Sequence, residues 1–183
     1  MLLDKPISGA RITIRDYQRA DLPHMTAMWF DGENGKYLSD PTAEYVDELY
    51  QKALDELEDN PRGYYLTVAL TDSQEIIGSA CVFPDEKMES FDIGYCIRKD
   101  CWGRKFGAEL IGLIVDWARG QGGLEITAEV ARENVASIRL LVNSGFEILR
   151  KSEFKKYNMD ICYESDIYRL RLSDTHRSSD NED

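Results

Sequence analysis

FDIGYCIRKDCWGRKFGAEL, residues 91–110, is the stretch of sequence that decides the fold. Its first part, 91–97, places an apolar side chain at every second position, which predicts a strand with one buried face. From 106 onward the apolar residues recur three or four apart, which predicts a helix. The turn between them, 98–107, contains two glycines and four basic side chains. Such a turn presents free backbone N–H groups and the positive end of the helix dipole, so it is predicted to bind an anion, usually a phosphate.

The whole chain has the composition of a soluble globular protein with one domain. It has 183 residues, of which 43% are hydrophobic and 31% are charged. This length allows one complete core and is short for two. No apolar run approaches the roughly 18–20 residues that cross a membrane, and the N-terminus lacks the apolar segment of a signal peptide. We therefore expect a cytoplasmic protein with no membrane partner.

The cysteines and histidines do not indicate a metal site. There are four cysteines and two histidines, at no zinc-site spacing. A chain of this size can also build its core without disulfides. We therefore expect free, buried or half-buried thiols and no bound metal.

Charge is the next constraint on function. The net charge is −12, which argues against nucleic acid as a partner and suits a cationic one. Residues 40–59 contain eight acidic residues and one lysine, whereas 98–107 contain four basic residues and one acidic residue. The acidic segment either attracts a cation or is simply the solvated face of a helix; the sequence leaves both readings open.

The remaining segments supply the other elements of one sheet and its helices. Strands are predicted at 11–15, 64–70, 76–83, 91–97, 124–130, 146–149 and 166–172, and helices at 22–29, 40–59, 105–119 and 134–144. This order predicts an α+β domain, 8–172, with a single mixed, mostly antiparallel sheet of about seven strands and helices on both faces. The polar segment 173–183 is predicted to be a disordered acidic tail.

Three motifs in the central region resemble one known family. They are DIGY at 92–95, WGRKFGA at 102–108, and EVARENVAS at 129–137, which is followed by NSGF at 143–146. In this order and spacing they resemble the GNAT family of N-acetyltransferases. The match is closest to the branch that acetylates ribosomal-protein N-termini. The resemblance implies the acyl-CoA N-acyltransferase fold and acetyl-CoA as co-substrate. It leaves the oligomeric state open, with a homodimer as one alternative.

The resemblance also implies a coenzyme site. Its residues would be Tyr95, Cys96, Ile97, Trp102, Gly103, Arg104, Lys105, Phe106, Gly107, Ala108, Asn134 and Ser137. Amides of the turn 102–107 would bind the pyrophosphate, while Asn134 and Ser137 would contact the pantetheine arm. A backbone N–H near Cys96 or Ile97 would polarise the thioester carbonyl.

The sequence departs from the family pattern at two of these places. Lys105 replaces a glycine of the pyrophosphate loop. Because this position opens a helix, where φ is normally negative, we expect that only its amide is used. Leu141 replaces a tyrosine that acts as the general acid in many members. The departing thiolate would then accept a hydrogen bond from Ser137 or leave unassisted, since a thiol pKa near about 8.5 makes it a tolerable leaving group.

Acetyl transfer also needs a base, because an amine starts as an ammonium with a pKa near about 10. Glu129 is the first candidate and Asp92 the second, both on polar faces of predicted neighbouring strands; each is alternatively an exposed strand carboxylate. A covalent mechanism through Cys96 or Cys101 lacks a partner histidine nearby in the sequence.

We therefore expect an acetyl-CoA-dependent N-acetyltransferase in which an amine attacks the thioester directly in a ternary complex. The acceptor would be a small-molecule primary amine or a protein N-terminus. The alternative is a non-catalytic acyl-CoA-binding or regulatory domain. The acceptor pocket is expected between 29–39, the helix at 40–60, the tip of the hairpin formed by 64–70 and 76–83, and the loop 157–163. The aromatic residues there are Trp29, Phe30, Tyr37, Tyr157 and Tyr163, which line a pocket or belong to the core.

Overall fold

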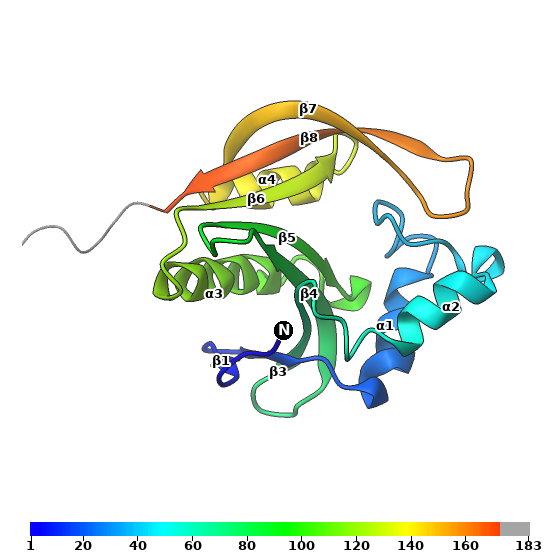
Figure 1. Cartoon of the computed structure of the whole chain (residues 1–183), viewed down its shortest axis with the longest axis horizontal. Helices are drawn as coiled ribbons and strands as arrows, with labels where there is room; N and C mark the ends of the chain where they lie inside the picture. The colour runs from blue at the N-terminus through cyan, green and yellow to red at the C-terminus, as the bar shows by residue number, and fades with distance from the viewer. Residues whose placement is uncertain (173–183) are drawn as a thin grey trace, which may run out of the picture.

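One eight-stranded sheet forms the centre of the molecule (Figure 1). The computed structural model describes residues 1–172, so the predicted tail at 173–183 lies outside the described residues. The strands are β1 (Ile7–Ser8), β2 (Ile12–Asp16), β3 (Tyr64–Leu70), β4 (Ile76–Pro84), β5 (Ser90–Ile97), β6 (Glu125–Ala131), β7 (Glu147–Lys155) and β8 (Cys162–Arg171). Their order is β1-β2-β3-β4-β5-β6-β8-β7, and only β5 and β6 pair in parallel. The predicted fold class is confirmed, with the two-residue β1 as an additional strand.

Within residues 1–172, four α-helices flank the sheet. They are α1 (Leu22–Trp29), α2 (Glu48–Asp55), α3 (Phe106–Gly120) and α4 (Val135–Asn143), and short 3₁₀ turns cover Arg19–Asp21, Ala43–Tyr45 and Lys99–Cys101. The side chains of α3 share the main core with Phe91 and Ile93 of β5, whereas Cys96 of β5 packs with Met25 and Met28 of α1. Since successive strand residues point to opposite faces, α3 and α1 cover opposite faces of the sheet.

The helix predicted at 40–59 is much shorter than expected. A 3₁₀ turn covers Ala43–Tyr45, and α2 begins only at Glu48, where the Asp47 carboxylate accepts a hydrogen bond from Tyr50 N at 2.8 Å. An Asp side chain that caps a helix in this way fixes its start. The apolar stripe is buried only in part, since Leu54 is 6% exposed and Leu49 is 69% exposed. The prediction of one long helix failed because the fold buries only part of the stripe.

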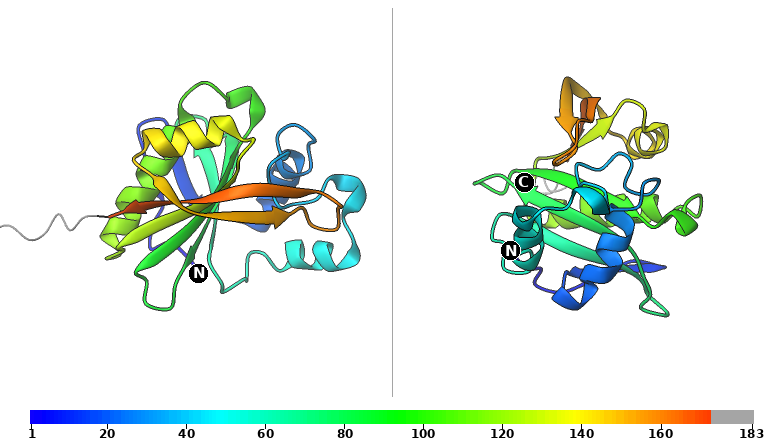
Figure 2. Two further views of the ribbon diagram at one scale, coloured as in Figure 1. Left: turned by 90° about the horizontal axis from the view of Figure 1, so that it is seen from above. Right: turned by 90° about the vertical axis from the view of Figure 1, so that its right-hand side faces the viewer.

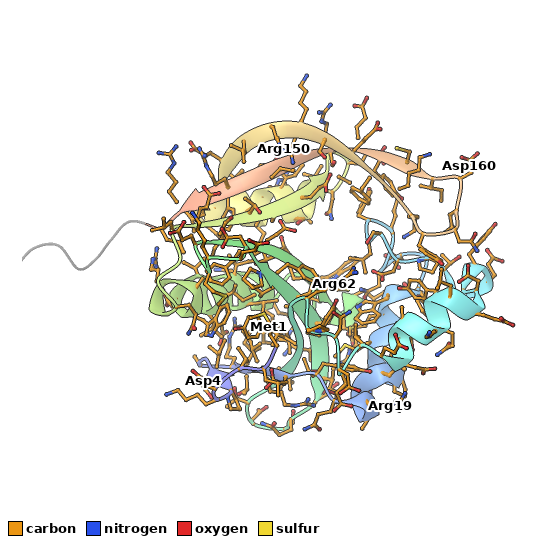
Figure 3. All side chains as sticks on the ribbon, viewed as in Figure 1. Met1, Asp4, Arg19, Arg62, Arg150 and Asp160 are labelled. Atoms are coloured by element: carbon orange, nitrogen blue, oxygen red, sulfur yellow. The ribbon has the colours of Figure 1, made fainter. Side chains whose placement is uncertain are left out.

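The last two strands are longer than predicted and form a ribbon that extends toward α2 (Figures 1 and 2). Asp160 lies at the tip of this ribbon in Figure 3. Behind the tip, the Tyr157 N–H donates to the carbonyl of Ser39 at 2.7 Å. The strand β7 is largely exposed, so it carries no alternation of apolar residues that would reveal its length. Its pairing with β8 holds it in place instead.

The parallel pair β5–β6 separates partway along its length (Figure 1). Pairing covers Ser90–Asp92 with Glu125–Thr127 and ends there. Beyond this point β5 stays with β4 as far as Ile97, and β6 stays with β8 as far as Ala131. We name the diverging ends of the two strands, residues 95–97 and 129–131, the splay.

Candidate active site

The turn that follows β5 has an unusual backbone. Gly103 has φ +73° and Lys105 has φ +63°, and α3 begins immediately after them at Phe106. The expectation that Lys105 has a negative φ was therefore wrong. The left-handed conformation costs an L-residue about 1–2 kcal/mol, which explains why a glycine suits this position. Lys105 adopts the loop conformation of a glycine and adds a positive charge to it.

A pair of variants measures this strain. Lys105→Gly and Lys105→Ala both remove the charge, but only glycine adopts a positive φ without strain. We expect the glycine variant to be more stable than the alanine variant by about 1–2 kcal/mol, or roughly 2–8 °C in melting temperature. Thermal unfolding followed by circular dichroism measures the difference. Equal melting temperatures would show that Lys105 is not held in the left-handed conformation.

Only two of the four basic side chains in this turn are available to an anion. Arg98 and Lys99 already form ion pairs at 2.5–3.4 Å. Their partners are Glu75 and Asp100 for Arg98, and Asp31 and Glu33 for Lys99. Within residues 1–172, Arg104 and Lys105 have no acidic partner within ion-pair distance, and both are exposed. They are the free positive charges beside the start of α3.

The start of α3 presents backbone donors to the same place. The first N–H groups of a helix have no acceptor within it, which leaves the amides of Phe106, Gly107 and Ala108 free to bind an anion. An acidic residue, Glu109, also lies in this first turn, but Arg11 binds its carboxylate through its backbone N–H at 2.7 Å and its side chain at 2.8 Å. Although burial opposes it, this contact holds the pKa of Glu109 below its usual value. Arg11, in the turn between β1 and β2, thus neutralises the negative charge of Glu109.

The backbone N–H of Ile97 points into the wide end of the splay, as the pairing of the next residue shows. Arg98 N–H donates to the Ile77 carbonyl of β4 at 2.8 Å. Donors alternate in direction along a strand, so the N–H groups of Tyr95 and Ile97 face the splay while that of Cys96 faces β4. The Trp102 indole donates to the Ile97 carbonyl at 2.7 Å, which ties the turn to this end of β5. Of the two amides expected near the thioester, only that of Ile97 therefore points into the splay.

The other side of the splay leads to the start of α4. Asn134 is the N-cap of this helix, and its side chain accepts a hydrogen bond from Ser137 N–H at 3.2 Å. The Ser137 hydroxyl lies 2.7 Å from the hydroxyl of Tyr95. The structure thus brings Tyr95 and Ser137, 42 residues apart in sequence, into direct contact.

The two candidate bases flank the splay on the opposite face, the one that α1 covers. Glu129 accepts a hydrogen bond from Ser165 Oγ at 2.5 Å, and Asp92 accepts one from Thr127 Oγ at 2.7 Å. Desolvation, together with the nearby charge of Glu129, raises the pKa of Asp92. Both residues are exposed on this face, so a substrate can reach them. The groups expected to face the coenzyme and the two carboxylates therefore lie on opposite faces of the splay.

A buried polar cluster between α2 and the ribbon β7–β8 was missed from the sequence. Tyr50 donates to Asp40 at 2.5 Å. Lys156 is only 4% exposed and donates from Nζ to the carbonyls of Gly35 and Leu38 at 2.9 and 2.8 Å. Burial raises the pKa of Asp40, and burial together with the charge of Asp40 raises the pKa of the Cys96 thiol. No local motif marks this cluster, because its members come from segments more than 100 residues apart.

The aromatic residues expected around the acceptor mostly pack on one another. Tyr157 packs against Tyr50 with ring centroids 4.9 Å apart, and Tyr37 packs against Tyr163 at 5.6 Å. Trp29 is half-buried and donates from its indole to Ser79 Oγ at 2.9 Å, as a core residue would. These pairs join the ribbon β7–β8 to α2 and to the segment before α2.

The helices within residues 1–172 are too short or too polar to span a membrane. No group of three or more His, Cys, Asp or Glu side chains in the same range is arranged to hold a metal ion.

Comparison with known proteins identifies relatives across most of the chain. Residues 11–147 match the family model described as an acetyltransferase (GNAT) domain. The uncharacterized N-acetyltransferase p20 of Bacillus licheniformis is 25% identical over 170 residues, which covers 88% of this chain and 92% of p20. A crystal structure of spermidine N-acetyltransferase from Vibrio cholerae, in complex with CoA and spermine, is similar with a TM-score of 0.74 at 18% identity, covering 90% of this chain and 97% of that one. The ribosomal-protein-S5-alanine acetyltransferase of Vibrio fischeri has a TM-score of 0.69 at 17% identity, covering 93% and 98%.

Proposed function

Because this chain belongs to the GNAT family and is an N-acetyltransferase, we propose that it transfers the acetyl group of acetyl-CoA to a primary amine. In this proposal the amine attacks the thioester directly while both substrates are bound. The acceptor is a small molecule or a protein N-terminus. The single observation that carries the proposal is the splay, which has a helix N-terminus at its wide end and two carboxylates on one face.

The coenzyme side of the proposal rests on the turn after β5. The free amides of Phe106–Ala108 and the unpaired charges of Arg104 and Lys105 suit a pyrophosphate. The pantetheine arm would then continue into the splay beside Asn134. The N–H of Ile97 would donate to the thioester oxygen as it becomes negative in the transition state. The V. cholerae relative binds CoA, which supports the same co-substrate here.

The acceptor side rests on the exposed face of β5 and β6. An amine becomes nucleophilic only after it loses a proton, and a carboxylate beside the thioester can accept that proton directly or through a water. We assign this role to Glu129, with Asp92 as the alternative. The negative charge of both groups also favours the approach of an ammonium ion.

These charges favour a cationic acceptor but do not select one class of amine. Small polyamines and protein N-termini are both cationic amines, and the similar structures include an enzyme named for each kind of substrate. A panel of acceptors should therefore contain polyamines, aminoglycosides, amino acids and short peptides that copy ribosomal-protein N-termini. The acceptor with the highest kcat/KM defines the class.

Binding of acetyl-CoA gives the first test. At a free concentration of 100 times Kd, mass action should raise the free energy of unfolding by about 2.7 kcal/mol, or roughly 5–10 °C in melting temperature. Release of free thiol in the presence of an accepted amine then reports transfer. An unchanged melting temperature would refute the coenzyme site. Binding without thiol release from any amine of the panel would favour the non-catalytic acyl-CoA-binding domain.

A further inference from the structure

Tyr95 is a residue of the splay whose side chain makes a contact across it. It lies on β5 beyond the last residue that pairs with β6. Its ring points to the same face as Phe91 and Ile93 and packs against the main core under α3. From there its hydroxyl reaches Ser137 in the first turn of α4, at 2.7 Å. Because α4 follows β6, this hydrogen bond connects the two sides of the splay.

The environment keeps the Tyr95 hydroxyl fixed and protonated. Ser137 is itself held by the side chain of Asn134, which accepts its N–H at 3.2 Å. Burial raises the pKa of Tyr95 to about 12. The phenol is therefore a hydrogen-bond donor throughout the neutral range. A fixed donor costs no reorganisation when charge develops next to it.

The side chains that flank the Tyr95–Ser137 pair most directly on this face are apolar. Ile93 and Val130, which flank the splay from β5 and β6, are apolar and buried. Leu141 of α4 is completely buried and carries no proton to give. The pair Tyr95–Ser137 places two hydroxyl groups in contact across the splay, on the side of α3 and α4.

We propose that Tyr95 donates a hydrogen bond to the sulfur of coenzyme A as the thioester C–S bond breaks, and that Ser137 is the positioning residue that orients it. This inference rests on the proposed function, because it needs coenzyme A in the splay. The amine nitrogen forms a bond to the acetyl carbon, and the electron pair of the C–S bond moves to sulfur. The proton of the amine passes to the carboxylate on the other face, and solvent later protonates the thiolate.

The sulfur accepts a hydrogen bond here and not a full proton. A free thiol has a pKa near about 8.5, well below that of Tyr95, so complete transfer from the phenol would be unfavourable. A charge-assisted hydrogen bond contributes enough to change rates by roughly 10- to 100-fold. The 2.7 Å contact allows either hydroxyl to be the donor; in this proposal Ser137 donates to the Tyr95 oxygen, which frees the phenol hydrogen for sulfur.

The test measures the thiol pKa of bound CoA, which needs no acceptor amine. Saturated complexes of the full chain are titrated with pH, and the ultraviolet absorbance that accompanies thiolate formation is followed. We expect Tyr95→Phe to raise the thiol pKa by about one to two pH units relative to wild type. Tyr64→Phe is the matched control, since it removes a hydroxyl from a core tyrosine of β3 that packs on Trp117. It should leave the thiol pKa unchanged.

Turnover with an accepted amine gives a second readout. Tyr95→Phe should lower kcat by roughly 10- to 100-fold while KM for acetyl-CoA stays within about twofold. Ser137→Ala should lower kcat by about 2- to 10-fold, and Ser137→Thr, which restores a hydroxyl, should recover most of it. A structural role alone would not produce this recovery at unchanged melting temperature.

The outcomes separate this inference from the proposed function. Equal thiol pKa values in wild type and Tyr95→Phe, with CoA bound to both, would overturn the inference and leave the proposed function standing. A Tyr95→Phe protein that melts like wild type but binds no CoA would also overturn it, because Tyr95 would then be a binding residue. Failure of wild type to bind CoA in calorimetry would refute the proposed function and the inference together.

Discussion

Glu129→Gln is expected to lower kcat by roughly 10²- to 10⁴-fold, the usual contribution of a general base. Glutamine keeps the shape of the side chain and its oxygen can still accept the hydrogen bond from Ser165, so the fold should be preserved. KM for acetyl-CoA should change little, since the carboxylate lies on the face opposite to α3 and α4. The loss should shrink as pH rises toward the amine pKa of about 10, because the free amine no longer needs the base.

Steady-state kinetics between pH 6 and 9 measure this effect, and two variants control it. Glu125→Gln makes the same change on the same face of β6, but at the end that is paired with β5 and away from the splay. It should keep kcat within about twofold. Asp92→Asn tests the alternative base. An unchanged kcat in Glu129→Gln across this range would remove the assignment, and a larger loss in Asp92→Asn would transfer it to Asp92.

Reversing both free charges of the turn is expected to weaken acetyl-CoA binding by at least about 100-fold. Each charge-assisted contact to a phosphate contributes about 1.5–3 kcal/mol, and the double variant Arg104→Glu/Lys105→Glu replaces two such contacts with repulsion. The backbone amides of α3 remain, so some affinity should persist. Because the remaining chemistry is unchanged, kcat at saturating acetyl-CoA should fall far less than kcat/KM.

Isothermal titration calorimetry measures this loss, and a second double variant controls for net charge. Lys151→Glu/Lys155→Glu makes the same change in charge on the exposed strand β7. It should leave Kd within about threefold. Equal Kd values for the two double variants would show that the phosphates lie elsewhere. The comparison should be made at one fixed salt concentration, since screening weakens exposed charges.

The central region could be predicted from the sequence because its signals are local. Alternation along 91–97 and the helical period after Phe106 each depend on one buried face, and the structure buries both against each other. The mixed character of the sheet followed from the helices between predicted strands, since a parallel pair requires a crossover connection. The positions of Glu129 and Asp92 on one face followed from the same alternation.

Other features depend on contacts that no local pattern encodes. The conformation of Lys105 is the clearest case, because a lysine gives no indication of positive φ. The stripe at 45–57 suggested a long helix, but its Tyr50 packs on Tyr157 at the distant end of the ribbon β7–β8. The meeting of Tyr95 with Ser137 depends on where α4 sits relative to β5. Such long-range packing decides the details of the candidate site.

A crystal structure of this protein with bound CoA tests the central claim most directly. We expect the pyrophosphate at the amides of Phe106–Ala108 and the pantetheine between β5 and β6. The sulfur should lie within hydrogen-bond distance of the Tyr95 hydroxyl, on the coenzyme side of the splay, with Glu129 on the other side. A coenzyme bound elsewhere, or a sulfur remote from both strands, would contradict the account.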